Sequence, residues 1–179
     1  MAHLGNVRFC RVPLACMSPV WTSQQQAVLA SAVMPGVRLA AMSLEDLPLA
    51  EFAFPGPLRD LLVAAILDGA KTTTTGLVAD YEHEGEPLPR PGLRQAVADS
   101  GGHRVAVIET TAVRVIRLGD VDLAHALGEG EGYRSVAEWR AGHEQFWHSA
   151  DMRRALDDPE FTVSDDTLVV AQTFRLLRH

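Results

Sequence analysis

The only lysine of the chain, Lys71, is the residue that the sequence singles out for chemistry. It stands in DGAKTTTTG, residues 68–76, whereas arginine occurs fifteen times. An ammonium is a compact charge that burial can deprotonate, and catalytic amines use this property. The threonines at 72–75 place hydroxyl groups beside the amine in a stretch stiffened by β-branching. The pattern predicts an amine and a hydroxyl acting together, although a single lysine must also fall somewhere by chance.

A carboxylate partner for this lysine is predicted at Glu109. Residues 104–117 have the composition of a strand, and its odd positions are mostly valines, so we expect the odd face to be the inner one. Glu109 would then point inward, where a carboxylate requires a cation or a proton. Lys71 is the natural partner. Two alternatives stay open: a β-bulge that turns Glu109 outward, and a structural pair with an arginine.

The turn GEGEGYRS, residues 128–135, is a second candidate for binding. Its backbone amides and the Arg134 guanidinium could hold an anion beside Tyr133, and ordinary helix capping with a solvated arginine is the alternative. Ser135 is expected to cap a helix that runs to about Ser149, with Glu138 completing a capping box. Trp139 and Phe146 on that helix are expected in the core.

The cysteines and histidines give no metal pattern. Cys10 and Cys16 match neither a paired-ligand nor a redox spacing, so we expect free thiols in a reducing compartment, the cytoplasm. His143 and His148 lie five residues apart and leave a common helical face. Neither a metal nor a cofactor is therefore expected.

Composition excludes several classes of protein. The chain has 179 residues, of which 47% are apolar and 22% charged, as in one globular domain. Its formal charge of −7 repels polyanions, so any RNA contact must be local and no DNA specificity is expected. No apolar run is long enough to span a membrane. The sequence gives no indication of the oligomeric state.

The N-terminal residues differ sharply from the rest. Residues 1–44 contain no acid, whereas all 23 acidic residues lie at or after Glu45. We expect 1–44 to be an extension that is poorly ordered or not native, with Met42 as a candidate start and the domain at 45–179. An organellar transit peptide is less well supported, because no amphipathic arginine helix is evident.

The elements that must position these residues follow from periodicity and turn residues. A helix over 57–68 is predicted from an apolar stripe of Leu58, Leu61, Leu62, Ala65 and Ile66, and Gly69 ends it. Residues 77–84 are either a turn of helix or a loop. The fold class is α+β with a mostly antiparallel, barrel-like sheet. Strands are expected over 49–54, 72–75, 93–99, 104–117 and 167–177, and further helical segments over 120–127, 135–149 and 151–158.

The chain resembles an ASCH domain in the order and spacing of four segments. They are the lysine motif, the proline-rich GEPLPRPG, the strand VAVIETTAVRV and the segment GEGYRSVAEWRAGHEQFW. The resemblance covers about residues 47–178. It implies a small PUA-like β-barrel with a cleft lined by the lysine motif. It also implies RNA binding, cleavage of single-stranded RNA, or deacylation of N4-acetylcytidine.

The amidohydrolase branch of this family uses a lysine, a threonine three residues later and a glutamate from a later strand. Lys71, Thr74 and Glu109 match these positions. That branch carries an arginine five residues after the lysine, where this chain has Gly76, and Arg134 is the candidate replacement. The residues expected to contact substrate are Phe54, Thr72, Thr75, Tyr133, Arg134 and Ser135.

Two functional hypotheses follow. In the first, the protein is a hydrolase for a modified nucleoside or single-stranded RNA, in which Lys71 activates the Thr74 hydroxyl and Glu109 carries the proton. A Lys71 that stays protonated would instead stabilise the oxyanion, and the sequence leaves both roles open. Either role requires a turned backbone between Lys71 and Thr74. In the second hypothesis the protein is a non-catalytic module that binds RNA or a nucleotide.

Overall fold

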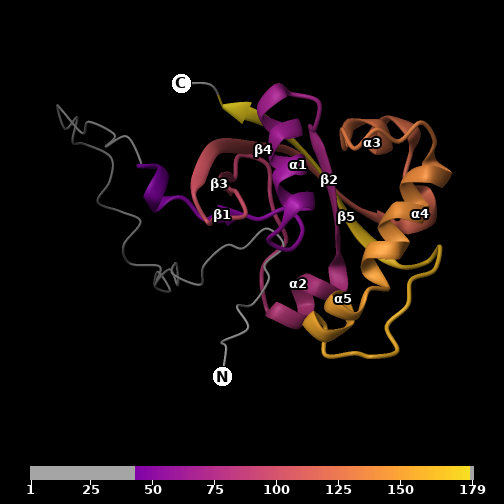
Figure 1. The fold of residues 1–179 in the computed structure, drawn as a ribbon. Helices are drawn as coiled ribbons and strands as arrows, with labels where there is room; N and C mark the ends of the chain where they lie inside the picture. The colour runs from indigo at the N-terminus through magenta and orange to yellow at the C-terminus, as the bar shows by residue number, and fades with distance from the viewer. Residues whose placement is uncertain (1–42, 178–179) are drawn as a thin grey trace, which may run out of the picture.

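The computed structural model describes residues 43–177, which form one open five-stranded sheet with helices packed on it (Figure 1). The order of the strands is β1-β3-β4-β5-β2; β1 pairs with β3 in parallel and all other pairs are antiparallel. The α+β class with a mostly antiparallel sheet is confirmed, whereas closure into a barrel is not. Both cysteines and nearly all of the predicted extension lie outside the described residues. The strands are β1 (Leu49–Ala50), β2 (Thr73–Leu77), β3 (Arg94–Ala98), β4 (Arg104–Arg117) and β5 (Leu168–Leu177).

The helices begin and end close to the predicted positions, and of the segment 77–84, left open between a helix and a loop, residues 78–84 form a helix. None of the helices within residues 43–177 combines the length and the apolar character that crossing a membrane requires. They are α1 (Pro57–Asp68), α2 (Val78–Glu84), α3 (Leu123–Gly128), α4 (Val136–Trp147) and α5 (Ala150–Ala155), with 3₁₀ turns at Leu44–Asp46 and Leu118–Asp120.

Helix α1 has the predicted bounds but buries a different face. Pro57 opens it, and Gly69 closes it in the left-handed conformation at φ 88°. Leu58 and Leu61, predicted to face the core, are 46% and 68% exposed. Arg59 takes a core position instead, and Leu62, Val63 and Ile66 are buried with it. The Arg59 guanidinium faces inward because its Nε and Nη2 donate to the carbonyl of Ala53, at 3.1 and 2.7 Å, and its Nη1 pairs with Glu51.

The two larger of three hydrophobic cores lie on opposite faces of the sheet. On β5, Val169 belongs to the core made with α3, α4 and α5, whereas Phe174 belongs to the core made with α1. Residues five apart on a strand point to opposite faces, so the helices cover both. Phe146 of α4 packs against both cores. Strand β2 is an edge of the sheet, and the two layers therefore approach each other along it.

Strand β4 has the predicted bounds, but the predicted parity is wrong. Ile108 and Thr110, on the supposed outer face, are 1% exposed, whereas Val105 and Val115 are 39% and 46% exposed. The register with β5 shifts between Thr110 and Ala112. A bulge adds one residue and reverses which face each later side chain takes, so no single alternation holds along the strand.

The loop after β1 departs from the expected strand over 49–54. Pairing to β3 ends at Ala50. Ala53 then adopts a left-handed conformation at φ 58°, which is uncommon for a residue with a side chain. The two hydrogen bonds from Arg59 to its carbonyl fix this turn.

The buried carboxyl of Asp80 in α2 gives a prediction for stability. Burial, and then the charges of Glu84 and Glu86, raise the pKa of Asp80 to about 7. A carboxyl whose pKa is raised in the folded state stabilises the protein less as pH climbs from the unfolded value toward 7. Above pH 7 the ionised Asp80 carboxylate lowers the free energy of unfolding by at most about 4 kcal/mol. Asp80→Asn should therefore raise Tm more at pH 8 than at pH 4.5, as measured by differential scanning calorimetry. An equal gain at both pH values would contradict the assignment, and Asp157→Asn on the exposed surface is the control.

Candidate functional site

A pocket of about 580 Å³, part of it open to solvent, lies beside the edge strand β2. Its walls come from the loop after β1, from α1, from the start of β2, from the glycine-rich loop and from α4. Both layers of helices contribute because they meet at this edge. The lining residues are Phe52, Ala53, Leu58, Leu62, Lys71, Thr74, Thr75, Glu129, Glu131, Tyr133, Gly142, His143, Phe146 and Trp147.

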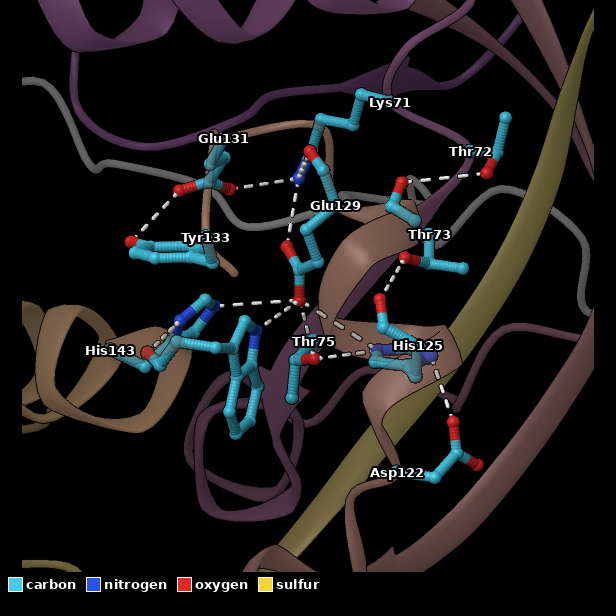
Figure 2. Close-up of polar contacts among 12 residues, drawn as sticks. Lys71, Thr72, Thr73, Thr75, Asp122, His125, Glu129, Glu131, Tyr133 and His143 are labelled. Atoms are coloured by element: carbon cyan, nitrogen blue, oxygen red, sulfur yellow. Dashed lines mark hydrogen bonds and ion pairs between the residues drawn. The ribbon is translucent and has the colours of Figure 1, made fainter. Parts of the chain in front are cut away.

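Lys71 lies at the base of this pocket and forms two ion pairs. Its side chain is 1% exposed, and its Nζ lies 2.8 Å from Glu129 Oε2 and 3.0 Å from Glu131 Oε1 (Figure 2). Nζ also donates to the Glu129 carbonyl at 3.2 Å. Burial lowers the pKa of Lys71, but the attraction of Glu129 and Glu131 outweighs it and the pKa is raised. Lys71 is therefore a fixed ammonium at neutral pH.

Glu129 is the most heavily bonded group of the site. Its Oε1 accepts hydrogen bonds from Thr75 at 2.7 Å and from Trp139 Nε1 at 3.1 Å, and its Oε2 accepts from Lys71. Burial raises the pKa of this carboxyl, but Lys71 and His143 bring it well below its usual range. A buried carboxylate with this many donors is held ionised.

The proton positions behind Glu129 follow from which groups can donate. Thr75 gives its hydroxyl proton to Glu129, so its oxygen accepts from His125 Nε2, 2.8 Å away. His125 therefore carries its proton on Nε2. Burial is the main cause that lowers the pKa of His125, so the ring is neutral. The hydrogen bonds from His125 to Thr75 and from Thr75 to Glu129 therefore fix the orientation of the Glu129 carboxylate.

The alternation GEGEG explains how two glutamates reach one lysine. Glu129 ends α3 in the right-handed helical conformation, and Gly130 then turns the backbone in the left-handed conformation, after which Glu131 reaches the same ammonium. A side chain at Gly130, which has φ 66°, would stand 2.6 Å from the backbone of Lys71, and one at Gly128 would stand 2.8 Å from Thr73. Glycine is needed at both positions because the loop packs directly on the start of β2. This alternation was the signal in the sequence for Glu129 and Glu131, which were not predicted.

His143, also not predicted for the site, enters the pocket from α4. Its Nδ1 lies 3.0 Å from the carbonyl of Trp139, and its Nε2 lies 3.5 Å from Glu129 Oε1. The Tyr133 hydroxyl nearby donates to Glu131 Oε2 at 3.3 Å, and burial raises the pKa of Tyr133 to about 12. Gly142 makes this arrangement possible, because a side chain there would collide with the Tyr133 hydroxyl.

The predicted contact residues divide into two groups. Lys71, Thr74, Thr75 and Tyr133 line the pocket. The Thr74 hydroxyl makes no side-chain hydrogen bond within residues 43–177. Thr74 is already extended in β2, so the expected turned backbone is wrong; Lys71 reaches the same pocket because it precedes the strand.

Other predicted contacts lie outside the lining. Phe54 packs its ring on Phe146, with centroids 5.6 Å apart. Thr72 is exposed and bonds weakly to the Gly128 carbonyl. The Arg134 side chain is 86% exposed and pairs with Glu138, so it does not replace the family arginine. Ser135 caps α4 by accepting from the Glu138 amide, while Glu138 accepts from the Arg134 amide rather than completing the expected box.

The expected pairing of Lys71 with Glu109 is wrong. Glu109 accepts from Arg94 Nε at 2.8 Å and from Arg175 Nη2 at 2.6 Å, and these bonds lower its pKa. Arg94 is its neighbour on β3 and Arg175 its neighbour on β5. The alternative of a structural pair with arginine is the one that the structure contains. Its physical reason is cross-strand register, which places cations directly opposite Glu109.

Packing against α2 explains why residue 76 is a glycine. A side chain built at this position would stand 3.3 Å from the ring of Tyr81, which is buried. The space beyond Gly76 is thus taken by an aromatic ring from α2. A long side chain at residue 76 would have to displace that ring.

Glu129, Glu131 and His143 are the residues that could hold a metal, since one ligand atom of each lies within 4.8 Å of the others. The Lys71 ammonium already pairs with both carboxylates of this set. A cation would have to displace it, so the residues fit a metal poorly. Two carboxylates face one ammonium in this pocket, and no arginine is among the described lining residues. The pocket suits a neutral, partly aromatic ligand better than a phosphate.

Comparison with known proteins places the chain in a family. A family model described as the ASCH domain matches residues 48–178. The crystal structure of an ASCH domain from Lactobacillus crispatus is similar, with a TM-score of 0.64 and 26% identity over 74% of this chain and 80% of that chain. Protein EF3133 from Enterococcus faecalis shares the fold, with a TM-score of 0.63 and 24% identity over 73% of this chain and 76% of that chain. No curated protein matches the sequence. The chain belongs to the ASCH domain family.

Proposed function

We propose that this protein is a hydrolase that removes an acyl group from the amino group of a modified nucleoside, with N4-acetylcytidine as the model substrate. The observation that carries the proposal is a buried ammonium, paired with two carboxylates, in a pocket that Thr74 and several aromatic side chains also line. The ASCH family, through its amidohydrolase branch, supports the same chemistry.

Lys71 acts as the group that stabilises the oxyanion. Its raised pKa makes it unsuitable as a base, because it has no lone pair at neutral pH. An ammonium held by Glu129 and Glu131 is oriented before the reaction, so it can face the negative charge that develops on an acyl oxygen. Of the two roles that the sequence left open, this is the one we adopt.

Thr74 is the nucleophile of the proposal and Glu131 is its base. The Thr74 hydroxyl has no competing partner in the described residues. Glu131, whose side chain is 18% exposed, is the more accessible of the two carboxylates, whereas Glu129 is 1% exposed and fully bonded. Glu131 therefore replaces Glu109 as the carboxylate that accepts the proton.

A nucleobase amide fits this pocket better than an RNA phosphodiester. Phosphate would approach two carboxylates and a single ammonium, without an arginine from the lining. A neutral acyl amide meets no such repulsion, and Phe52, Phe146 and Trp147 offer surfaces for a base.

The proposal predicts that the full chain converts N4-acetylcytidine to cytidine and acetate. The 5′-monophosphate of the same nucleoside should react at least about tenfold more slowly, because its phosphate would be repelled by the carboxylates of Glu129 and Glu131. Liquid chromatography of the products measures both. Cleavage of single-stranded RNA without deacylation would replace the proposal with a ribonuclease. Salt-dependent RNA binding without any turnover would replace it with a binding module.

Lys71 variants test the role of the fixed charge. Lys71→Met should lower kcat/KM by roughly 10² to 10³-fold, because it removes the charge that faces the oxyanion. Lys71→Arg should keep more activity than Lys71→Met, since it retains a cation without a transferable proton. Steady-state kinetics of the two variants is the measurement.

Folding must be checked beside these kinetics, because an unpaired buried carboxylate costs about 3 to 5 kcal/mol. Circular dichroism and Tm report whether each variant is folded. Arg154→Met, at an exposed arginine that pairs with Asp151, is the matched control and should retain full activity. Equal loss in folded Lys71→Arg and Lys71→Met would contradict the charge role.

A further inference from the structure

His143 is the one group of the pocket whose two ring nitrogens face different surroundings. The Nδ1 atom lies 3.0 Å from the Trp139 carbonyl, one turn earlier in α4. A carbonyl oxygen can only accept, so Nδ1 carries the proton and donates it. Nε2 is therefore the nitrogen that remains for chemistry.

The surroundings of Nε2 favour a proton there as well. It faces Glu129 Oε1 at 3.5 Å, and Glu129 is ionised (Figure 2). A bare lone pair on Nε2 would point at a carboxylate, whereas an N–H would be attracted to it. The backbone carbonyl thus fixes the orientation of the ring, and the carboxylate lies where a proton on Nε2 would face it.

The ring is also held rigidly at the pocket wall. It stacks on Trp139 with centroids 4.3 Å apart and meets the edge of Trp147 at 5.1 Å. Its side chain is 12% exposed, and it is among the residues that line the pocket. A fixed ring with one working nitrogen is suited to proton transfer.

We propose that His143 Nε2 donates the proton that the leaving nitrogen of the substrate requires. This inference rests on the proposed hydrolysis and assigns its missing acid. Glu129 lies between Lys71 and His143, since its Oε2 holds Lys71 and its Oε1 faces His143. The oxyanion site and the proton donor are thereby kept in a fixed relation to each other.

The complete reaction balances with these residues. Glu131 takes the hydroxyl proton of Thr74, whose oxygen forms a bond to the acyl carbon while the carbon–nitrogen bond breaks. The leaving nitrogen takes the proton from Nε2, and the amine departs. Water then attacks the acyl-threonine and gives a proton to the neutral His143, and Thr74 recovers its proton from Glu131. The net change is amide and water to carboxylic acid and amine.

The test is His143→Gln in the full chain, assayed with N4-acetylcytidine. We expect kcat to fall roughly 10² to 10³-fold with KM changed less than about threefold. The wild-type rate should decline as pH rises, because the acid must be protonated, and this decline should be absent in the variant. The charged and titratable groups that line the pocket with the ring are Glu129, Tyr133, Lys71 and Glu131. The pKa values of Tyr133 and Lys71 are raised, so neither explains a decline near neutral pH.

A second measurement does not depend on turnover. An imidazolium against Trp139 and Trp147 should quench their fluorescence, so wild-type emission should fall as pH is lowered. The change should disappear in His143→Gln and persist in His103→Gln, whose parent side chain is 79% exposed.

The outcomes separate the two proposals. Hydrolysis by wild type with a folded His143→Gln variant within twofold of it would overturn the role of His143 and leave the proposed function intact. Absence of hydrolysis by wild type would overturn the proposed function. In that case a fluorescence titration unchanged in His143→Gln would also overturn the assignment of a titrating His143, whereas its loss would support it.

Discussion

The ion pair between Lys71 and Glu129 is the interaction on which the site depends. Both side chains are 1% exposed, so each charge has lost its water and requires the other. The pair joins residues 58 positions apart in the chain. It brings the end of α1 and the start of β2 against the glycine-rich loop, which in turn leads into α4. Removing either partner would leave a buried charge without the opposite charge that lies nearest to it.

The neighbouring hydrogen bonds offset the loss of hydration of the buried Lys71–Glu129 pair. Thr75, Trp139 and the Lys71 ammonium supply Glu129 with donors, and His125 orients Thr75 from behind. Such a network fixes one geometry because each member would otherwise be unsatisfied. The position of β2 at the sheet edge allows side chains from both helical layers to reach the same hollow, so a preorganised polar base is combined with aromatic walls.

Much of the local structure followed from the sequence, because it depends on neighbouring residues. The bounds of α1 were set by Pro57 and Gly69, and the start of α4 by Ser135. The predictions of which side chains are buried were wrong where contacts with residues distant in the sequence determine burial. Arg59, rather than Leu58 or Leu61, occupies a core position of α1, because its guanidinium donates to the carbonyl of Ala53. The bulge at Thr111 reversed the faces of β4, which alternation alone cannot reveal.

The sequence by itself determined that Lys71 is unusual, that Thr74 follows it and that the family is that of ASCH domains. Only the tertiary structure decided which carboxylates meet the lysine. Glu109 has valine neighbours along its strand, but register gives it Arg94 and Arg175 across the sheet. Glu129 and Glu131 lie on a loop whose glycines permit contact with the backbone of Lys71. Charge pairing depends on distance in space, and spacing along the chain fixes that distance only within a single element.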